Sequence, residues 1–255
     1  MDFTIEETKL VTIKEEVKEG NQLEAQFIIE PLLPGYGVTL GNALRRVLIG
    51  SLPGAAVRSI VIGGVNHEFS TLSGMREDVL ELILNIKGLH LKLNNVDRAV
   101  LKLSKKGAGE VTAKDFVANP DCEIINSAHR LVHLDKDGKL DLEVTVGSGR
   151  GYISADLQKE ANQPIETIFV DSSYTPVVKV NFQVEQTRVG GMTNFDRLTI
   201  LVGTNGAITP QQALKSAAKI LTEHFGLLDE AIKIEEKTKE KKESKKKVVV
   251  KKTKR

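Results

Sequence analysis

Residues 37–54 carry apolar side chains on two opposite sides of a predicted helix. One stripe has the i, i+4, i+7, i+8 spacing of a core-facing helix and consists of Leu40, Leu44, Val47 and Leu48. Val38 and Ile49 fall on the other side, flanked by Arg45 and Arg46. Because arginine is favoured at interfaces, the pattern predicts a helix that packs on its own domain by one face and on another protein by the other. The alternative is a fully buried helix with two arginines that reach solvent.

Strand patterns lie at both ends of the chain. Residues 8–16 and 22–30 predict a hairpin around a turn at 18–21, because apolar and polar residues alternate along the second segment. Residues 176–188 and 196–203 alternate in the same way. Each predicted strand therefore has one face for a core and one face for solvent.

A second helix is predicted after these strands. Thr209 suits the N-cap, Pro210 the first helical position, and Gln212 completes a capping box. One stripe of this helix consists of Leu214, Ala217, Ala218, Leu221, Phe225 and Leu228. Both helices are more apolar than one buried face requires. Two such helices predict a symmetric dimer, since a twofold interface lets the same surface cover itself.

The middle of the chain has a different sequence pattern. Residues 55–180 hold short strand-like runs separated by turn signals such as Asp137-Gly138, and one helix is predicted over 77–87. We therefore expect an α+β fold in which both chain ends build one domain and a second domain is inserted. The expected parts are a dimerisation domain at 1–52 plus 180–232, an inserted β-rich domain at 53–179 and a disordered basic tail at 233–255.

Composition points to an aliphatic core in a reducing compartment. Of the 255 residues 40% are hydrophobic and only 4% aromatic, and Trp does not occur. Cys122 is the single cysteine, so an internal disulfide is excluded. No apolar run approaches the roughly 20 residues that span a bilayer, and the N-terminal residues lack a hydrophobic signal core. We predict a cytoplasmic protein with no membrane partner.

Charge is distributed unevenly along the chain. Residues 233–255 contain 12 Lys or Arg against 4 Asp or Glu, whereas the rest contains 24 against 30. A basic, low-complexity tail next to a mildly acidic body is typical of disorder. Weak contact with DNA phosphates is one interpretation of the tail, and a solubilising terminus is the other.

Candidate motifs for chemistry are weak. His129 and His133 share a strand face without further ligands at a recognised spacing. A hairpin turn explains the calcium-loop-like run at 135–138, and the glycine-rich run at 147–152 lacks the Rossmann and P-loop spacings. Cys122 lies in an apolar strand, which favours a structural thiol over a nucleophile. We expect no metal, no cofactor and no catalytic residue in this chain.

Several blocks of this sequence carry a close resemblance to a known family. They are TLGNALRRVLIGSLPG at 39–54, HEFSTLSGMREDVLELILNIKGL at 67–89, GRGY at 149–152, VDSSYTPVVKVNFQVEQTRVG at 170–190 and TNGAITPQQAL at 204–214. Together they resemble the N-terminal domain of the bacterial RNA polymerase alpha subunit. The resemblance extends from about residue 8 to residue 230, and TLGNALRR is its most specific block.

The resemblance implies an assembly scaffold in a DNA-directed RNA polymerase, with nucleotide addition belonging to the whole enzyme. In that family two alpha chains dimerise through the helix at 37–51 and the helix at about 210–230. The homodimer is the platform for the beta and beta-prime subunits. We assign the dimer interface to the apolar residues of these helices, which are Leu44, Val47, Leu48, Leu214, Ala217, Leu221, Phe225 and Leu228.

The resemblance also implies contact residues for the large subunits. Arg46 matches the arginine of the first helix implicated in docking beta. The other residues assigned to large-subunit contact are Arg45, Ile49, Leu40, Gly41, Asn42, Lys87, Val170 and Tyr174. Two of these have a structural alternative. Lys87 could serve only to end the helix at 77–87, since cations favour helix C-termini, and Gly41 could serve packing.

One departure from the family pattern concerns DNA. Family members continue into a C-terminal helical domain that binds upstream promoter DNA, whereas this sequence ends at Arg255 after the basic tail. Either the protein lacks that domain or the sequence is truncated, so the resemblance leaves upstream recognition open.

Two other functional classes are alternatives to a scaffold subunit. One is a hydrolase or nucleotide-binding enzyme, and the other is a stand-alone nucleic-acid-binding protein. The first needs convergent titratable groups, and the second needs a basic folded body with interleaved aromatics.

Overall fold

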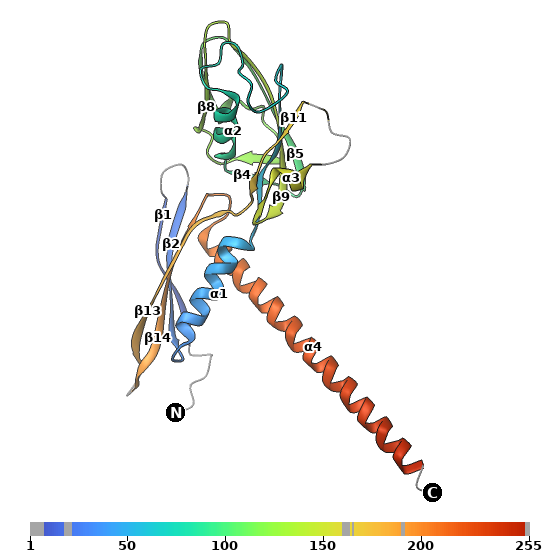
Figure 1. The fold of residues 1–255 in the computed structure, drawn as a ribbon. Helices are drawn as coiled ribbons and strands as arrows, with labels where there is room; N and C mark the ends of the chain where they lie inside the picture. The colour runs from blue at the N-terminus through green and yellow to red at the C-terminus, as the bar shows by residue number, and fades with distance from the viewer. Residues whose placement is uncertain (1–7, 18–21, 160–163, 165, 190–191, 253–255) are drawn as a thin grey trace.

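The computed structural model describes residues 8–17, 22–159, 164, 166–189 and 192–252. Two lobes are visible in Figure 1, and a long C-terminal helix projects away from both. We call the lobe built from both chain ends the helix–sheet lobe. The other, which runs from Pro53 to Ser173, is the insert lobe. The fold is mixed α+β, as predicted.

A four-stranded antiparallel sheet forms the base of the helix–sheet lobe. Its strand order is β1-β2-β14-β13, so the two ends of the chain meet at the centre of the sheet. The strands are β1 (Lys9–Val17), β2 (Leu23–Leu32), β13 (Val177–Val189) and β14 (Met192–Thr204). The predicted hairpin is confirmed for its two strands. The turn predicted at 18–21 lies outside the described residues.

Two helices cover one face of this sheet. Helix α1 (Tyr36–Gly50) packs against β13 and β14, and α4 (Pro210–Lys252) begins over β14 and β2. The central register pairs Ala25 with Val202 and Phe27 with Ile200, and all four side chains are buried beneath the helices. The alternation predicted from the sequence therefore builds this core.

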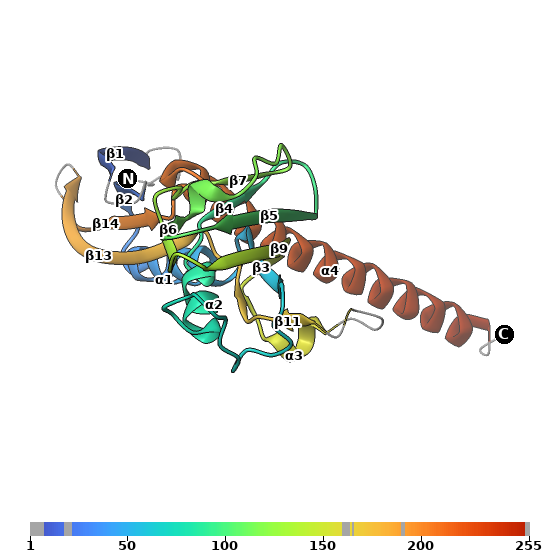
Figure 2. The same cartoon turned by 90° about the horizontal axis from the view of Figure 1, so that it is seen from above.

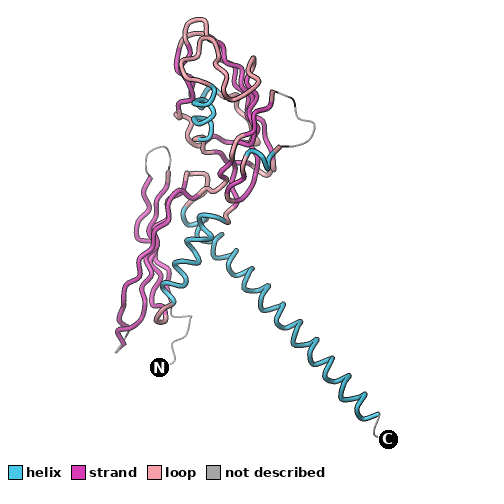
Figure 3. The backbone as a smooth tube through the Cα atoms, in the orientation of Figure 1, coloured by secondary structure: helices cyan, strands magenta, loops and turns pink. Residues whose placement is uncertain are grey.

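The insert lobe is mostly β (Figure 3). Its main antiparallel sheet has the order β11-β3-β9-β5, formed by Thr167–Phe169, Pro53–Ile62, Lys139–Arg150 and Arg98–Lys106. Helix α2 (Val79–Lys87) packs on this lobe through Val79, Leu82, Ile83 and Ile86. The remaining elements are β4 (Leu91–Leu93), β6 (Gly109–Thr112), η3 (Ala113–Asp115), β7 (Cys122–Ile124), β8 (Arg130–Leu134), β10 (Tyr152–Ile153), α3 (Ala155–Gln158) and β12 (Ser172–Ser173).

The predicted start of the last helix is confirmed. The Thr209 N–H donates to Gln212 Oε1 at 3.1 Å and the Gln212 N–H donates to Thr209 Oγ1 at 3.2 Å, which is a capping box. The structure continues α4 to Lys252, however, where disorder was expected from residue 233. Lys and Glu dominate this stretch, and both are good helix formers, so local propensity favours helix despite low complexity. No helix in the described part of the chain has the length and apolar character needed to cross a bilayer.

Candidate subunit interface

Helix α1 presents two different faces, as its pattern predicts. Gly37, Gly41, Leu44 and Leu48 are buried against the sheet. The opposite face is exposed, with Val38 51% and Ile49 43% accessible. The alternative of a fully buried helix is therefore wrong for the chain alone.

We call the outward side of this helix the α1 outer face, and it consists of Val38, Asn42, Arg45, Arg46 and Ile49. Each of these side chains is exposed. No ion pair joins Arg45 or Arg46 to any carboxylate of the described residues. Two guanidinium groups beside exposed aliphatic side chains form a surface suited to a protein partner.

Helix α4 carries one apolar stripe that its own lobe covers only in part. Ala213, Leu214 and Ala217 are buried in the core at the start of the helix. Farther along, the helix leaves the body, as Figures 1 and 2 both show. The later residues of the same stripe are Phe225, Leu228 and Ile232, which we call the uncovered stripe, and all three are exposed. Such a stripe in water is unfavourable until another surface covers it.

The structure corrects part of the predicted dimer interface. Leu44, Leu48, Leu214 and Ala217 lie in the core of their own lobe, so their side chains are not available to a second chain. Val47 and Leu221 are half-buried at the edge of that core. Helical periodicity shows that residues share a face, but it does not show which neighbour covers that face.

Gly41 serves packing rather than contact. A Cβ at this position would lie 2.6 Å from Cδ2 of Phe182, so the glycine lets α1 approach β13 closely. Leu40 is half-buried at the edge of the core. Of the predicted contact residues on this helix, Asn42, Arg45, Arg46 and Ile49 are the ones with exposed side chains.

Gly41→Ala should therefore destabilise the protein. We expect a loss of about 1–2 kcal/mol, since the overlap with the Phe182 ring outweighs the helix propensity gained. Gly50→Ala is the matched control, because a Cβ on Gly50 of the same helix would meet nothing within 4 Å. Thermal unfolding at one fixed protein concentration compares the two variants. Equal melting temperatures would show that the close approach is not needed.

Lys87 lies at a junction between the lobes. It ends α2, and its Nζ lies 3.8 Å from Oδ2 of Asp171. A cavity of about 200 Å³ opens beside this pair and is also lined by His90, Thr175 and Asn205. The Asp171 pKa is lowered, chiefly by the hydrogen bond from the Ala155 N–H, so the carboxylate stays charged opposite Lys87. Both explanations of Lys87, as helix terminus and as contact residue, fit this position.

Val170 and Tyr174 are not surface residues. Both are buried in the described structure. The Tyr174 hydroxyl lies 3.4 Å from Oε1 of Gln158, and its ring packs over Gly149. The prediction that these two side chains contact a large subunit is therefore corrected, because they hold the insert lobe together instead.

Two residues have structural roles that were not predicted from the sequence. Gln158 is buried, and its Nε2 donates to the carbonyl of Val170 at 2.9 Å and to Ser172 Oγ at 2.8 Å. It thereby holds the segment around Asp171. Asp196 binds the start of α1 from a strand far along the chain. For Asp196, the signal that the sequence offers is the lack of a capping side chain before α1.

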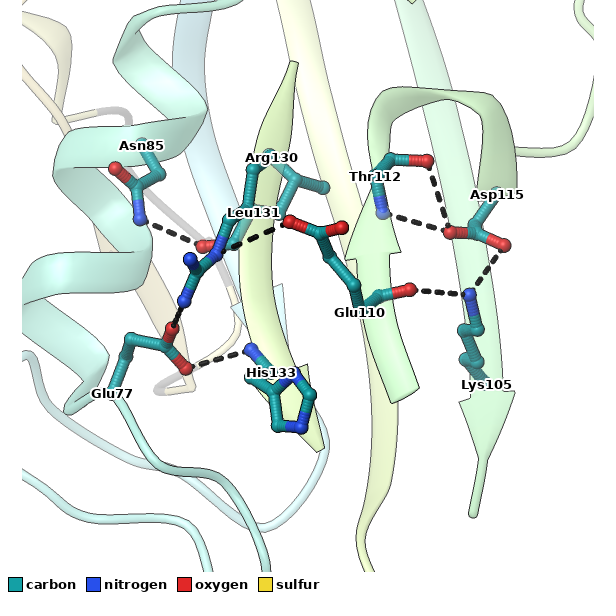
Figure 4. A network of polar contacts seen from close by, with 9 residues as sticks. All are labelled: Glu77, Asn85, Lys105, Glu110, Thr112, Asp115, Arg130, Leu131 and His133. Carbon is teal, nitrogen blue, oxygen red and sulfur yellow. Dashed lines mark hydrogen bonds and ion pairs between the residues drawn. The ribbon is translucent and has the colours of Figure 1, made fainter. Parts of the chain in front are cut away.

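A polar network ties α2 to the neighbouring strands of the insert lobe (Figure 4). Glu77, just before α2, accepts a hydrogen bond from Arg130 Nη2 at 2.6 Å and another from the His133 N–H at 2.7 Å. Its side chain is only 8% exposed. Burial raises the pKa of Glu77, but the His133 N–H and the Arg130 guanidinium more than offset burial, so the pKa lies below its ordinary value.

Glu77→Gln should lower stability near neutral pH by about 1–2 kcal/mol, because Glu77 accepts with a different oxygen from each donor and the amide NH2 would replace one of these oxygens. A carboxyl whose folded pKa is depressed contributes stability above its unfolded pKa, which is near 4.5. That contribution is lost as the pH falls through the folded pKa. The difference in melting temperature between wild type and variant should therefore shrink below about pH 4.5. Glu123→Gln, at an exposed position of the same lobe, is the control, and parallel pH curves for wild type and Glu77→Gln would contradict this account.

The other candidate groups have structural partners. Nε2 of His129 lies 2.8 Å from the carbonyl oxygen of Asn85, at the end of α2. Within the described residues no three His, Cys, Asp or Glu side chains gather as metal ligands would. Cys122 is buried, and burial raises its pKa to about 11, so the thiol stays protonated near neutral pH.

These features define a class of protein: an α+β protein whose helix–sheet lobe exposes helix surface and whose β-rich lobe is inserted between helix α1 and strand β13. The family model of the RNA polymerase Rpb3/RpoA insert domain matches residues 59–175, which fall largely within the insert lobe.

The chain is similar to three proteins named DNA-directed RNA polymerase subunit alpha. The one from Carboxydothermus hydrogenoformans is 51% identical over 214 residues, which is 84% of this chain and 68% of the relative. The one from Desulforudis audaxviator is 51% identical over 202 residues, 79% of this chain and 64% of the relative. The one from Desulfitobacterium hafniense is 48% identical over 229 residues, 88% of this chain and 73% of the relative. The chain belongs to the family of bacterial RNA polymerase alpha subunits.

Proposed function

We propose that two copies of this chain form a homodimeric scaffold on which the beta and beta-prime subunits of DNA-directed RNA polymerase assemble. The observation that carries the proposal is helix surface left uncovered by the chain itself. The uncovered stripe of α4 and the α1 outer face are both apolar in part and exposed. Family membership supports a subunit role, since each relative is named as a subunit of a larger enzyme.

The uncovered stripe suits a second copy of the chain. Phe225, Leu228 and Ile232 continue a stripe whose beginning is already a core surface, so a similar apolar partner should cover the rest. A twofold axis supplies that partner, because each copy offers the same stripe to the other. This assignment keeps Phe225 and Leu228 of the predicted interface, adds Ile232 and leaves out the four residues that lie in the core.

The α1 outer face suits a different chain. Arg45 and Arg46 add charge and fixed hydrogen-bond donors to an aliphatic patch, which is the composition of a hetero-subunit contact rather than of a core. We assign this face to beta. We assign the cavity beside Lys87 and Asp171 to a second contact with a large subunit, made by the insert lobe.

In this proposal the chain contributes assembly, and nucleotide addition takes place elsewhere in the enzyme. The helix–sheet and insert lobes act as the predicted dimerisation and inserted domains. Two separate clusters of buried residues support that division, one around Phe27, Leu48 and Ile200 and the other around Ile60, Leu82 and Val144.

Reconstitution tests the proposal. The purified chain should sediment at twice its mass of 28.0 kDa, and the immobilised chain should retain purified beta and then beta-prime. The order of addition matters, since beta alone should bind the dimer through the α1 outer face. A monomer at micromolar concentration that retains neither large subunit would refute the scaffold.

A further inference from the structure

Helix α1 begins without a cap from its own sequence. Gly35 occupies the N-cap position with a φ of 85°, no local side chain caps the helix, and the first turn contains no acidic residue. The first N–H groups of any helix lack partners within the helix. The chain before α1 therefore leaves donors that some other element must satisfy.

Asp196 supplies the acceptor from strand β14. Its Oδ2 accepts hydrogen bonds from the Gly35 N–H at 2.9 Å and from the Gly37 N–H at 3.0 Å. Asp196 is 9% exposed and shares the helix-facing side of β14 with Leu198 and Ile200. A carboxylate at a helix N-terminus is favourable both for its charged hydrogen bonds and for its interaction with the helix dipole.

The start of α1 also packs closely on the sheet. A Cβ on Gly37 would lie 3.0 Å from Oδ2 of Asp196 and 2.7 Å from Cγ1 of Val184. The backbone of the helix start thus packs directly on the side chains of Val184 in β13 and Asp196 in β14. The pairing of β14 with β2 also changes register between Asp196 and Leu198, and such irregularities re-aim side chains.

We propose that Asp196 is a positioning residue for the α1 outer face. This inference rests on the proposed docking of beta to that face. Binding two N–H groups of the first turn to one carboxylate oxygen sets where the helix begins and how it is rotated on the sheet. Arg46 belongs to the same helix, so a rotation of the helix on the sheet turns this side chain away from its outward direction by the same angle.

Two variants at this position separate anchoring from general stability. Asp196→Ala removes the acceptor, and Asp196→Asn keeps the shape and one oxygen. We expect Asp196→Ala to bind purified beta about tenfold more weakly and Asp196→Asn to stay within about threefold of wild type. Amide hydrogen exchange should accelerate at the first turn of α1 in the alanine variant. If the alanine variant does not fold, Asp196→Ser replaces it with the same expected loss, since serine is too short to reach both N–H groups.

The control is Glu77→Gln, which should lower stability from the insert lobe without touching α1. Equal loss of beta affinity in Glu77→Gln and Asp196→Ala would overturn the positioning role, because instability alone would then explain the loss. Wild-type affinity in Asp196→Ala would overturn it as well. Arg46→Ala separates this inference from its premise. If Arg46→Ala binds beta normally, the proposed docking face is wrong. If it binds weakly while Asp196→Ala binds normally, only the positioning role fails.

Discussion

Arg46→Ala should weaken capture of the beta subunit about 30-fold and leave the dimer intact. Buried arginines at the centre of interfaces commonly contribute about 2 kcal/mol, which corresponds to that factor. Arg46 lies on the exposed side of α1, away from the core formed by Leu44 and Leu48. Truncation therefore removes a contact for another chain without opening a cavity in this one, and the melting temperature should stay within the effect of a surface substitution.

The measurement is equilibrium binding of purified beta to the immobilised alpha dimer, with sedimentation to confirm that the dimer persists. Lys92→Ala is the matched control, because it removes one exposed positive charge from the insert lobe. Arg46→Lys adds a second comparison, since lysine keeps the charge but loses the planar donor set. If Arg46→Ala binds beta as tightly as Lys92→Ala does, α1 is not part of the docking surface.

Much of the helix–sheet lobe was open to prediction because its signals are local. The two-sided pattern of α1, the alternation of β2 and β14 and the capping box of Thr209 each depend on residues close in sequence. Local periodicity and cap chemistry decide such features. The residues predicted opposite the core-facing stripe of α1, which are Val38, Arg45, Arg46 and Ile49, are accordingly exposed.

Burial between distant segments was not open to prediction in the same way. The motif around Tyr174 is polar in composition, yet Gly149 and Gln158 enclose the ring from other parts of the chain. The stripe of α4 is continuous in sequence, yet the sheet covers Leu214 and leaves Phe225 exposed. Where a helix leaves its sheet depends on the length of the strands beneath it, and periodicity carries no information about that length.

The second of the two largest effects is expected on α4. Phe225→Asp combined with Leu228→Asp should convert the dimer to a monomer, raising its dissociation constant at least about 100-fold. Both side chains are mostly exposed in the single chain, at 65% and 60%, so the change leaves the core of the protomer intact. In the dimer each new carboxylate would lie against apolar surface without a partner, which is strongly unfavourable.

The choice of position decides what this experiment measures. Aspartate at Leu221 would also disturb the edge of the protomer's own core, where that residue is half-buried, so loss of dimer and loss of fold would be confounded. Lys219→Asp places the same residue on the opposite side of α4, where the side chain is 76% exposed. Sedimentation across a concentration series should show monomer for the double variant and dimer for the control. The secondary structure of the two variants should melt at similar temperatures. A double variant that remains dimeric would mean that another surface joins the two copies. Because α1 is the other helix of the helix–sheet lobe and also exposes apolar side chains, Val38 and Ile49 would then be the next positions to test.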